Sequence, residues 1–477
     1  MSRQILIDPV TRIEGHAKIT IHLDEAGYAD DARLHITQFR GFEKLCVGRP
    51  FTEMPALMAR TCGICPVSHL IAAAKACDAI LAVRVPAAAI KLRRVLNLAQ
   101  IIQSHALSFF YLSSPDLLFG MDSDPARRNF AGVLEAAPEL ARDGIRLRQF
   151  GQQTIELLGG KRIHPAWVVA GGVSAPLDVS ARDTILARIP AMLAAARHSL
   201  VWFHRILDQH QESIRTFANF PSMYMALARR DESGEVLPDW YDGDLRFVDS
   251  DGSVVVDAVA PDRYAEYIGE AVEPWSYMKF PYFRPAGYPA GIYRVGPLAR
   301  LNIAGRSGTP LADEEWLSFR ALRPGAVHNT FYYHYARLIE ILAAIEHIER
   351  LLRDPEILDR HVRAITGPNS AEGVGVAEAP RGTLLHHYRI DQNGLVTWSN
   401  LIIATGHNNL AMNRGISQVA RAVVDGARLT EGALNRVEAV IRAFDPCLSC
   451  ATHADGTMAL QLQLIGPDGA VLDEARR

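Results

Sequence analysis

The stretches RTCGIC, residues 60–65, and DPCLSC, residues 445–450, each contain two cysteines spaced as Cys-x-x-Cys. About 380 residues separate the two pairs, whereas the pairs of a local zinc module normally lie about 12–20 residues apart. A four-thiolate metal site built from them would tie both ends of the chain to one buried point. Thiolates favour soft or borderline metals, so the candidates are nickel, iron, copper(I) and zinc. The spacing therefore suggests a large metalloenzyme.

The composition is that of an ordinary globular protein with enough residues for a large core. Of the 477 residues, 49% are hydrophobic and 22% are charged, and the six cysteines are too few for a disulfide framework. The formal net charge is −3 without a basic stripe, which argues against nucleic acid or a membrane surface as a partner. No apolar run is long enough to span a membrane. The N-terminus MSRQILIDPV is too short and polar for a secretory signal, so we expect a cytoplasmic protein.

Hydrophobic periodicity predicts a mainly α-helical protein with minor β structure, an α+β fold in which long helices form a core bundle with β pieces at its periphery. We expect one large domain over residues 1–453, with an irregular Gly-, Pro- and aromatic-rich lobe at residues 221–310. The expected helices cover residues 66–83, 87–112, 125–158 with breaks, 181–217 split by Pro190, 311–322, 329–352, 409–424 and 430–443. The expected β pieces are a hairpin at residues 17–39, a strand at 397–404 and a small hairpin after residue 453, with a loop at 370–381.

Polar residues beside the two cysteine pairs bear on their chemistry. Arg60 stands just before the first pair and would favour thiolate forms if it points inward. His69 and His453 follow the first and the second pair, and each is a candidate metal ligand or hydrogen-bond donor to a thiolate. Taken alone, the pairs are also compatible with structural zinc or with redox thiols.

Four motifs together resemble the large subunit of nickel–iron hydrogenases. They are RIEGH at residues 12–16, RTCGICPVSH at 60–69, EAPRG at 378–382 and DPCLSCATH at 445–453. They occur in the order typical of that family, and the resemblance extends over nearly the whole chain. It is strongest for the cytoplasmic NAD-reducing branch, through FRGFEK at residues 39–44, WSYMKFP at 275–281 and RGTLLHH at 381–387.

The resemblance implies the nickel–iron hydrogenase large-subunit fold and a catalytic subunit that reversibly cleaves dihydrogen into protons and electrons. It also implies a nickel ion bound by four thiolates, with an iron ion beside it that carries carbon monoxide and cyanide. Cys65 and Cys450 would be shared between the two metals. The implied metal ligands are Cys62, Cys65, Cys447 and Cys450.

By the same resemblance, several charged residues would serve this centre. Glu14 would relay the proton that Cys447 accepts, a step for which a carboxylate is suited. Arg381 would lie over the open site, where its planar guanidinium suits anionic ligands. Its carboxylate partners would be Asp116 and Asp445.

The resemblance also assigns roles near the C-terminus. His69 would donate a hydrogen bond to a shared thiolate, and Glu43 and His453 would hold a magnesium or similar ion, with water in its other positions. A maturation chaperone and a dedicated endopeptidase would act on the chain. The endopeptidase would cut after His453 once nickel is in place and release residues 454–477 as a propeptide, which couples folding of the chain end to metal binding.

Electrons would have to leave this chain through partners. The chain has no Gly-x-Gly-x-x-Gly run after a strand and no motif cysteines left for an iron–sulfur cluster, so we expect it to bind no NAD, flavin or cluster itself. The resemblance implies diaphorase subunits that bind flavin and NAD, together with an iron–sulfur small subunit, as partners. Two alternatives stay open: another hydrogenase branch with a different electron acceptor, and a non-catalytic scaffold of the same fold around a four-cysteine zinc site.

Overall fold

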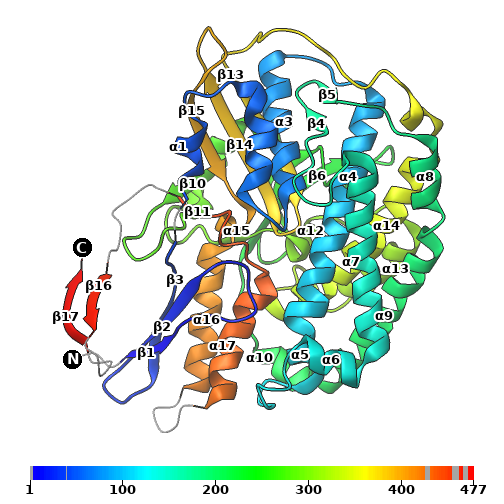
Figure 1. Ribbon diagram of the computed structural model, residues 1–477. Helices are drawn as coiled ribbons and strands as arrows, with labels where there is room; N and C mark the ends of the chain where they lie inside the picture. Colours follow the sequence, from blue (N-terminus) through cyan, green and yellow to red (C-terminus); the bar gives the residue numbers. More distant parts are fainter. Residues whose placement is uncertain (1–3, 39, 425–429, 454–460, 466–470, 477) are drawn as a thin grey trace.

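Long helices pack side by side to form the centre of the molecule, as Figure 1 shows. In this computed structural model the described residues are 4–38, 40–424, 430–453, 461–465 and 471–476. Helix α14 packs against α4 and α9 and is buried on nearly every side, because apolar residues occur all round it. This arrangement confirms the expected helical core. The central helices are α3 (Pro66–Leu81), α4 (Ala87–Ala106), α7 (Pro138–Gly159), α9 (Ile189–Gln209) and α14 (Tyr333–Arg353).

Proline determines where several helices begin. Pro138 opens α7, and Pro190 lies in the first turn of α9, because proline suits the start of a helix and not its interior. The expected split near Pro190 is therefore confirmed. A π-helical segment, Leu107–Ser113, follows α4. The other helices are α1 (Phe42–Cys46), α2 (Met54–Met58), α5 (Ser114–Phe119), α6 (Phe130–Ala136), α8 (Val179–Leu186), α10 (Gln211–Thr216), α11 (Tyr264–Tyr267), α12 (Pro297–Ile303), α13 (Pro310–Arg320), α15 (Ala404–His407), α16 (Asn409–Val423) and α17 (Glu431–Phe444).

An antiparallel sheet near the N-terminus contains the expected hairpin. Strands β1 (Gln4–Ile7), β2 (Ala17–Leu23) and β3 (Ala29–Ile36) lie in that order. Ile19 and Ile21 alternate along β2 and are fully buried, because successive side chains of a strand point to opposite faces. Strand β3 lies against α16, so the sheet covers one side of the helical core.

The region expected to be an irregular lobe contains a five-stranded sheet. Its strands follow the order β12-β6-β8-β9, with β7 paired to β6. Buried residues such as Leu227 and Phe247 give this sheet a small core of its own. The expectation of irregular structure is wrong, because short strands between Gly- and Pro-containing turns leave little periodicity to detect. The strands of the region are β6 (Met223–Arg230), β7 (Val236–Pro238), β8 (Asp244–Val248), β9 (Val254–Val259), β10 (Ile268–Ala271), β11 (Phe280–Phe283) and β12 (Tyr293–Arg294).

Strand β13 (Glu372–Ala379) occupies most of the segment expected to be a loop. It pairs with β14 (Gly382–Ile390), which pairs with β15 (Val396–Ile402). Helix α3 lies directly on β13, and a Cβ atom on Gly375 would stand 2.0 Å from the carbonyl oxygen of Ala72. Glycine thus lets the helix backbone touch the strand. The loop expectation is wrong because glycines needed for this contact weaken the strand pattern.

The remaining strands are short. Strand β4 (Val168–Val169) pairs with β5 (Gly172–Val173), and β15 is the strand expected near residue 397. In the tail, β16 (Gln461–Ile465) pairs with β17 (Val471–Arg476), which confirms the small hairpin. Its Pro-Asp-Gly turn lies outside the described residues. Of the helices in the described ranges, none combines the length and the apolar character that crossing a bilayer requires.

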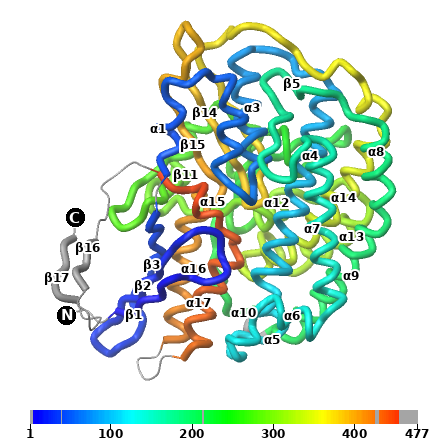
Figure 2. Tube along the Cα trace, viewed as in Figure 1, coloured from blue at the N-terminus to red at the C-terminus, as the bar shows by residue number. Residues whose placement is uncertain are grey.

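Two segments from opposite ends of the sequence lie side by side next to the cysteines. Figure 2 shows the blue segment before β2 beside the orange and red segment at the end of α17. A parallel bridge joins Glu14 to Cys447, and the N–H of Leu448 donates to the carbonyl oxygen of Glu14 at 3.2 Å. Farther along, the N–H and hydroxyl of Thr11 both donate to the Glu438 carboxylate at 2.9 Å. These contacts align the two chain ends.

Candidate metal centre

The four motif cysteines meet at one buried point between the start of α3 and the end of α17. Their sulfur atoms all lie within 4.8 Å of one another. The Cys62 sulfur is 3.1 Å from that of Cys65 and 3.2 Å from that of Cys447, and the Cys65 sulfur is 3.7 Å from that of Cys450. These separations exceed the roughly 2.05 Å of a disulfide bond, and all four thiols are free. Each cysteine is at most 5% exposed, so any metal here would be shielded from water.

The start of α3 supplies hydrogen-bond donors to the first pair. Cys65 caps the helix and Pro66 opens it. The N–H groups of Ile64 and Cys65 donate to the Cys62 sulfur at 3.2 and 3.1 Å. Hydrogen bonds of this kind are typical partners of a metal-bound sulfur. Arg60 is exposed and does not turn into the cluster as the sequence allowed.

A sharp turn after α17 presents the second pair. Asp445 ends the helix in the left-handed conformation with a φ of 55°, which aspartate tolerates better than most residues. The N–H of Cys447 donates to the Thr405 hydroxyl at 2.9 Å. The backbone at this turn is therefore held from two sides, by the helix end and by α15.

Glu14 lies against this second pair. It is half-buried, and its carboxylate accepts a hydrogen bond from the N–H of Ser449 at 3.1 Å. The next residue, Gly15, has a φ of 89°, and a Cβ atom there would stand 2.8 Å from the Cβ of Leu448. Glycine therefore permits the close approach that places Glu14 beside the cysteine loop.

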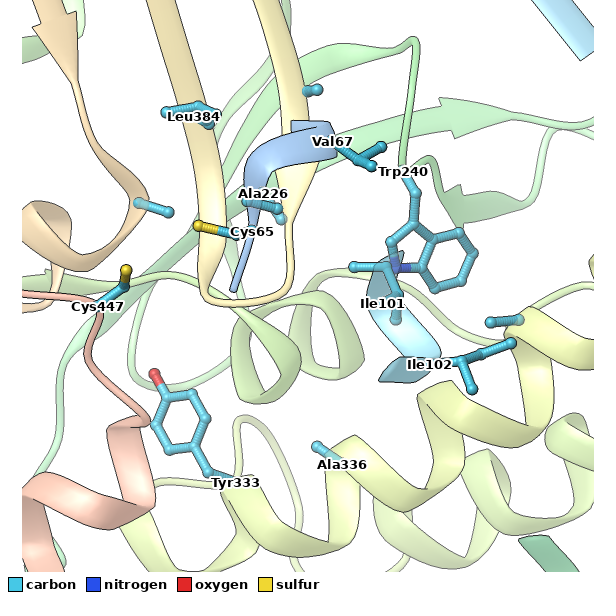
Figure 3. Close-up of a cluster of buried hydrophobic side chains, with 14 of the residues drawn as sticks. Cys65, Val67, Ile101, Ile102, Ala226, Trp240, Tyr333, Ala336, Leu384 and Cys447 are labelled. Carbon is cyan, nitrogen blue, oxygen red and sulfur yellow. The ribbon is translucent and has the colours of Figure 1, made fainter. Parts of the chain in front are cut away.

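The surroundings of the cluster are apolar. Figure 3 shows Cys65 and Cys447 among buried hydrophobic side chains that include Val67 and Leu384. Burial raises the pKa of Cys447 and Cys450 well above the usual value, because a thiolate is poorly stabilised away from water. Hydrogen bonds with the neighbouring cysteines lower the pKa of Cys65. A bound cation would stabilise all four sulfurs as thiolates in this setting.

Arg381 lies in the turn between β13 and β14, next to the sulfurs. Its Nε donates to the carbonyl oxygen of Asp445 at 2.5 Å, and its Nη2 donates to the Asp445 carboxylate at 3.1 Å. Its Nη1 donates to the Ser104 hydroxyl at 3.1 Å. Burial alone would lower the pKa of Arg381, but Asp445 and the cysteines raise it above its usual value. The pairing with Asp445 is the one expected, and it fixes a positive charge beside the cluster.

Asp116 does not support Arg381, so that expectation is wrong. Its carboxylate accepts from Arg12 and, at 3.0 Å, from Nε of Arg442, and Nε of Arg128 lies 3.5 Å away. Burial would raise the pKa of Asp116, but Arg442 and Arg12 lower it. Helix α5 turns this carboxylate toward the start of the chain and toward α17, where these arginines occupy its oxygens.

His69 is buried in the first turns of α3. Its hydrogen bond to Cys65, which the resemblance implies, stays a prediction. Its Nδ1 lies 3.2 Å from Nε2 of His386 on β14. The sequence offered no partner for His386, because 317 positions separate it from His69 and only the packing of α3 on the sheet joins them.

Glu43 and His453 meet as expected. Nδ1 of His453 lies 2.9 Å from one carboxylate oxygen of Glu43. The other oxygen accepts from the N–H of Leu401 at 3.0 Å and from the ammonium of Lys279 at 3.2 Å. Burial would raise the pKa of Glu43, but His453 and Lys279 lower it to about 2. A partly buried, ionised carboxylate thus stands between an imidazole and an ammonium group.

Three residues that the sequence did not assign contact the site. Ser104 binds Arg381, Thr405 orients Cys447, and Lys279 faces Glu43. None has a spacing that ties it to a cysteine motif. They come from α4, α15 and the segment before β11, so only tertiary packing brings them to the site.

The donor set suits a soft metal. Four buried sulfurs close together favour nickel, iron, copper(I) or zinc over magnesium or calcium, which prefer oxygen ligands. In the described ranges the four cysteines form the one group of at least three His, Cys, Asp and Glu side chains close enough to share an ion. Arg381 and Glu14 add a fixed cation and a carboxylate at its edge, which can hold anionic ligands and carry protons.

The known proteins that this chain resembles include nickel-dependent hydrogenases. A family model described as nickel-dependent hydrogenase matches residues 40–125 and 232–453, and one described as HoxL-like matches residues 4–39. The chain is 43% identical to the NAD-reducing hydrogenase HoxS subunit beta of Cupriavidus necator, over all of both chains. It is 41% identical to a chain of the vhu F420-non-reducing hydrogenase of Methanocaldococcus jannaschii, over 88% of this chain and 99% of that one.

Solved structures extend the comparison. An NAD+-reducing NiFe-hydrogenase crystallised in the H2-reduced state matches with a TM-score of 0.91 and 45% identity, over 94% of this chain and 99% of that one. The Ni-Fe-Se hydrogenase of D. vulgaris Hildenborough shares the fold, with a TM-score of 0.77 at 23% identity over 95% of this chain and 100% of that one. With the family model covering more than half of the sequence, the chain belongs to the nickel-dependent hydrogenase family.

Proposed function

We propose that the chain is the large, catalytic subunit of an NAD-reducing nickel–iron hydrogenase, which reversibly cleaves dihydrogen into protons and electrons. The observation that carries this proposal is the buried cluster of four cysteine sulfurs within 4.8 Å of one another. Full-length similarity to one component of an NAD-reducing hydrogenase supports the choice of branch.

Nickel would bind all four sulfurs, and an iron with carbon monoxide and cyanide ligands would share Cys65 and Cys450 with it. When bound, this pair supplies a Lewis acid that polarises dihydrogen. Arg381 contributes a fixed positive charge and planar N–H donors, which suit anionic ligands such as cyanide. Asp445 and Ser104 orient the guanidinium through three hydrogen bonds. The apolar surroundings strengthen these electrostatic interactions.

Cys447 and Glu14 would move the proton. The Cys447 sulfur is buried, whereas Glu14 is half-buried, so the carboxylate would link the cluster to the outside of the protein. The bridge between the two residues and the hydrogen bond from Ser449 hold Glu14 at this position. A carboxylate held in this way can accept a proton from the sulfur and pass it on.

Magnesium would bind beside this centre, at Glu43 and His453. One carboxylate and one imidazole leave most positions of a magnesium ion to water. The ammonium group of Lys279 donates to the Glu43 carboxylate. The magnesium ion and this ammonium group would therefore both interact with the negative charge of Glu43. His69 would donate a hydrogen bond to Cys65 and would not bind metal.

Electrons would pass first to an iron–sulfur small subunit, then to diaphorase subunits that bind flavin and NAD. This chain would bind none of these groups itself, because its motif cysteines serve the metal centre. The two other cysteines, Cys46 and Cys77, donate to the backbone oxygens of Phe42 and Phe51 away from the cluster. We place the complex in the cytoplasm. Similarity to the F420-non-reducing enzymes keeps a different electron acceptor as the alternative.

Maturation would require a chaperone and an endopeptidase that removes residues 454–477. His453 is 4% exposed, and its N–H donates to the carbonyl oxygen of Tyr277 at 2.8 Å. A chain that ends at His453 can therefore keep this residue buried beside Glu43. Removal of the tail after nickel has entered would leave His453 as the chain end in this buried position.

Nickel retention tests the metal assignment. Cys447→Ala is expected to abolish it, because one of the four thiolates is lost. Cys77→Ala is the matched control, since Cys77 is equally buried but lies outside the cluster. Nickel, iron and zinc per chain are measured by mass spectrometry of the purified complex. Parental nickel in Cys447→Ala would contradict the assignment, and zinc without nickel in the parent would favour a structural scaffold.

Isotope exchange tests the proton relay. Glu14→Gln is expected to keep its metals but to slow hydrogen–deuterium exchange by about a hundredfold or more, because an amide does not relay protons at neutral pH. Glu25→Gln, which removes an exposed carboxylate, is expected to exchange at the parental rate. Exchange by Glu14→Gln at the parental rate would assign Glu14 a structural role only.

Arg381 makes three hydrogen bonds, so a substitution can test whether its planar guanidinium is required. Arg381→Lys keeps the charge but loses the planar set of donors, so dihydrogen oxidation is expected to fall by at least about tenfold, roughly 1.4 kcal/mol in barrier. Arg353→Lys, at an exposed position on α14, is the control. Equal turnover rates of the two variants would remove Arg381 from the catalytic site.

The intact mass of the active protein tests the processing proposal. Enzyme purified from its native host is expected to lack residues 454–477, since the proposed endopeptidase cuts after His453 once nickel is in place. Inactive, nickel-free chain from the same cells is expected to retain them. A fully active enzyme that still carries the tail would show that cleavage is unnecessary.

A further inference from the structure

A small cavity lies where α4, β6 and α14 meet the segment after β7, and none of the residues that line it belongs to the metal centre. Its volume is about 60 Å³. A water molecule needs roughly 10–15 Å³ by this measure, so the cavity admits about five non-hydrogen atoms. Trp240 and His347, which are 5% and 7% exposed, form its buried part. The side chains of Arg229 and Arg350 are exposed, so the cavity opens to solvent beside them.

Positive charge is in excess around this cavity. Its lining contains three guanidinium groups, those of Arg94, Arg229 and Arg350, but one carboxylate, that of Asp239. One oxygen of Asp239 accepts from Arg94 at 2.8 Å, and the other lies 3.3 Å from Nε of Arg229. Burial and the charges of Arg229 and Arg94 lower the pKa of Arg350. Three cations against one anion leave an excess of two positive charges.

Arg350 is the cation of this lining that lacks a carboxylate partner. Its guanidinium donates to the carbonyl oxygen of Gly308 at 3.3 Å and to Nδ1 of His347 at 2.8 Å. Glu346 lies one turn earlier on α14, but its two oxygens accept hydrogen bonds from backbone N–H groups at the start of α13. Within the described part of the chain, no carboxylate oxygen lies within the 4.0 Å of an ion pair with Arg350.

His347 adds a buried donor that has no acceptor. A guanidinium can only donate, so Nδ1 of His347 accepts from Arg350. Burial and the charge of Arg350 lower the pKa of His347 to about 3, so the ring is neutral and its proton lies on Nε2. Neither this atom nor Nε1 of Trp240 has a hydrogen-bond partner among the described residues. Buried N–H groups without acceptors are costly, and both belong to side chains that line the cavity.

We infer that this cavity binds a small oxyanion of the size of inorganic phosphate. Such an ion would offset the excess positive charge and supply acceptors where the protein has none. Guanidinium groups suit it, because their paired N–H donors match the spacing of phosphate oxygens. Pockets for larger ligands usually measure about 300–1,000 Å³, so the free ion is the ligand. Binding here is independent of the proposed function, since no residue of the cavity takes part in that function.

Equilibrium dialysis of the purified complex against labelled phosphate tests this site, with ionic strength held constant by chloride. Arg350→Gln is expected to bind the ion at least about tenfold more weakly than the parent, because a charged donor is lost. Arg353→Gln is the matched control, since it removes an exposed arginine three positions farther along α14. It is expected to bind phosphate as the parent does. Phosphate bound by partner subunits would be the same in all three proteins.

A second substitution separates loss of the ion from loss of folding. Arg229→Gln removes another exposed guanidinium from the opposite side of the cavity and is also expected to weaken binding, with the thermal unfolding temperature in chloride unchanged. A parent that takes up no phosphate, or parental binding by both Arg350→Gln and Arg229→Gln, would overturn the inference and leave the proposed function intact. A parent without nickel would overturn the proposed function and leave this site intact.

Discussion

The burial of four cysteine sulfurs from both ends of the chain is the constraint on which the rest of the structure depends. Negative charge away from water is costly unless donors or cations compensate it. Two backbone N–H groups at the start of α3 donate to the Cys62 sulfur, and the positive charge of Arg381 interacts with Cys62, Cys65 and Cys447. To bring the second pair to the same point, the segment around Glu14 must align with the turn after α17. The long helices between them form a core that positions these two ends.

Buried ion pairs hold the surrounding elements in place. Arg300 on α12 binds both Glu340 on α14 and Glu378 on β13, and all three are fully buried. This network attaches β13, the strand that precedes Arg381, to the central helix α14. Breaking such a pair by removing one partner typically costs about 3–5 kcal/mol. The position of Arg381 is therefore set by the core as well as by its own contact with Asp445.

Local sequence predicted the parts of the fold that have a local physical cause. Apolar periodicity and proline placed the long helices, including the division at Pro190, because helix-forming residues act over a few positions. The same reasoning failed for β13. Its glycines read as loop residues, yet Gly375 is where α3 touches the strand. A pattern that arises from contact between distant elements is not visible in a window of neighbouring residues.

The sequence by itself identified the family and the four cysteines that meet, because four motifs occur in the order typical of that family. Only the tertiary structure decided which charges and donors meet. Asp116 forms ion pairs with Arg12 and Arg442. Arg381 contacts Asp445 and Ser104 instead. Hydrogen bonds and ion pairs act over a few ångströms, whereas these partners lie far apart in the chain. Which of them come within that distance depends on how the helices and sheets pack.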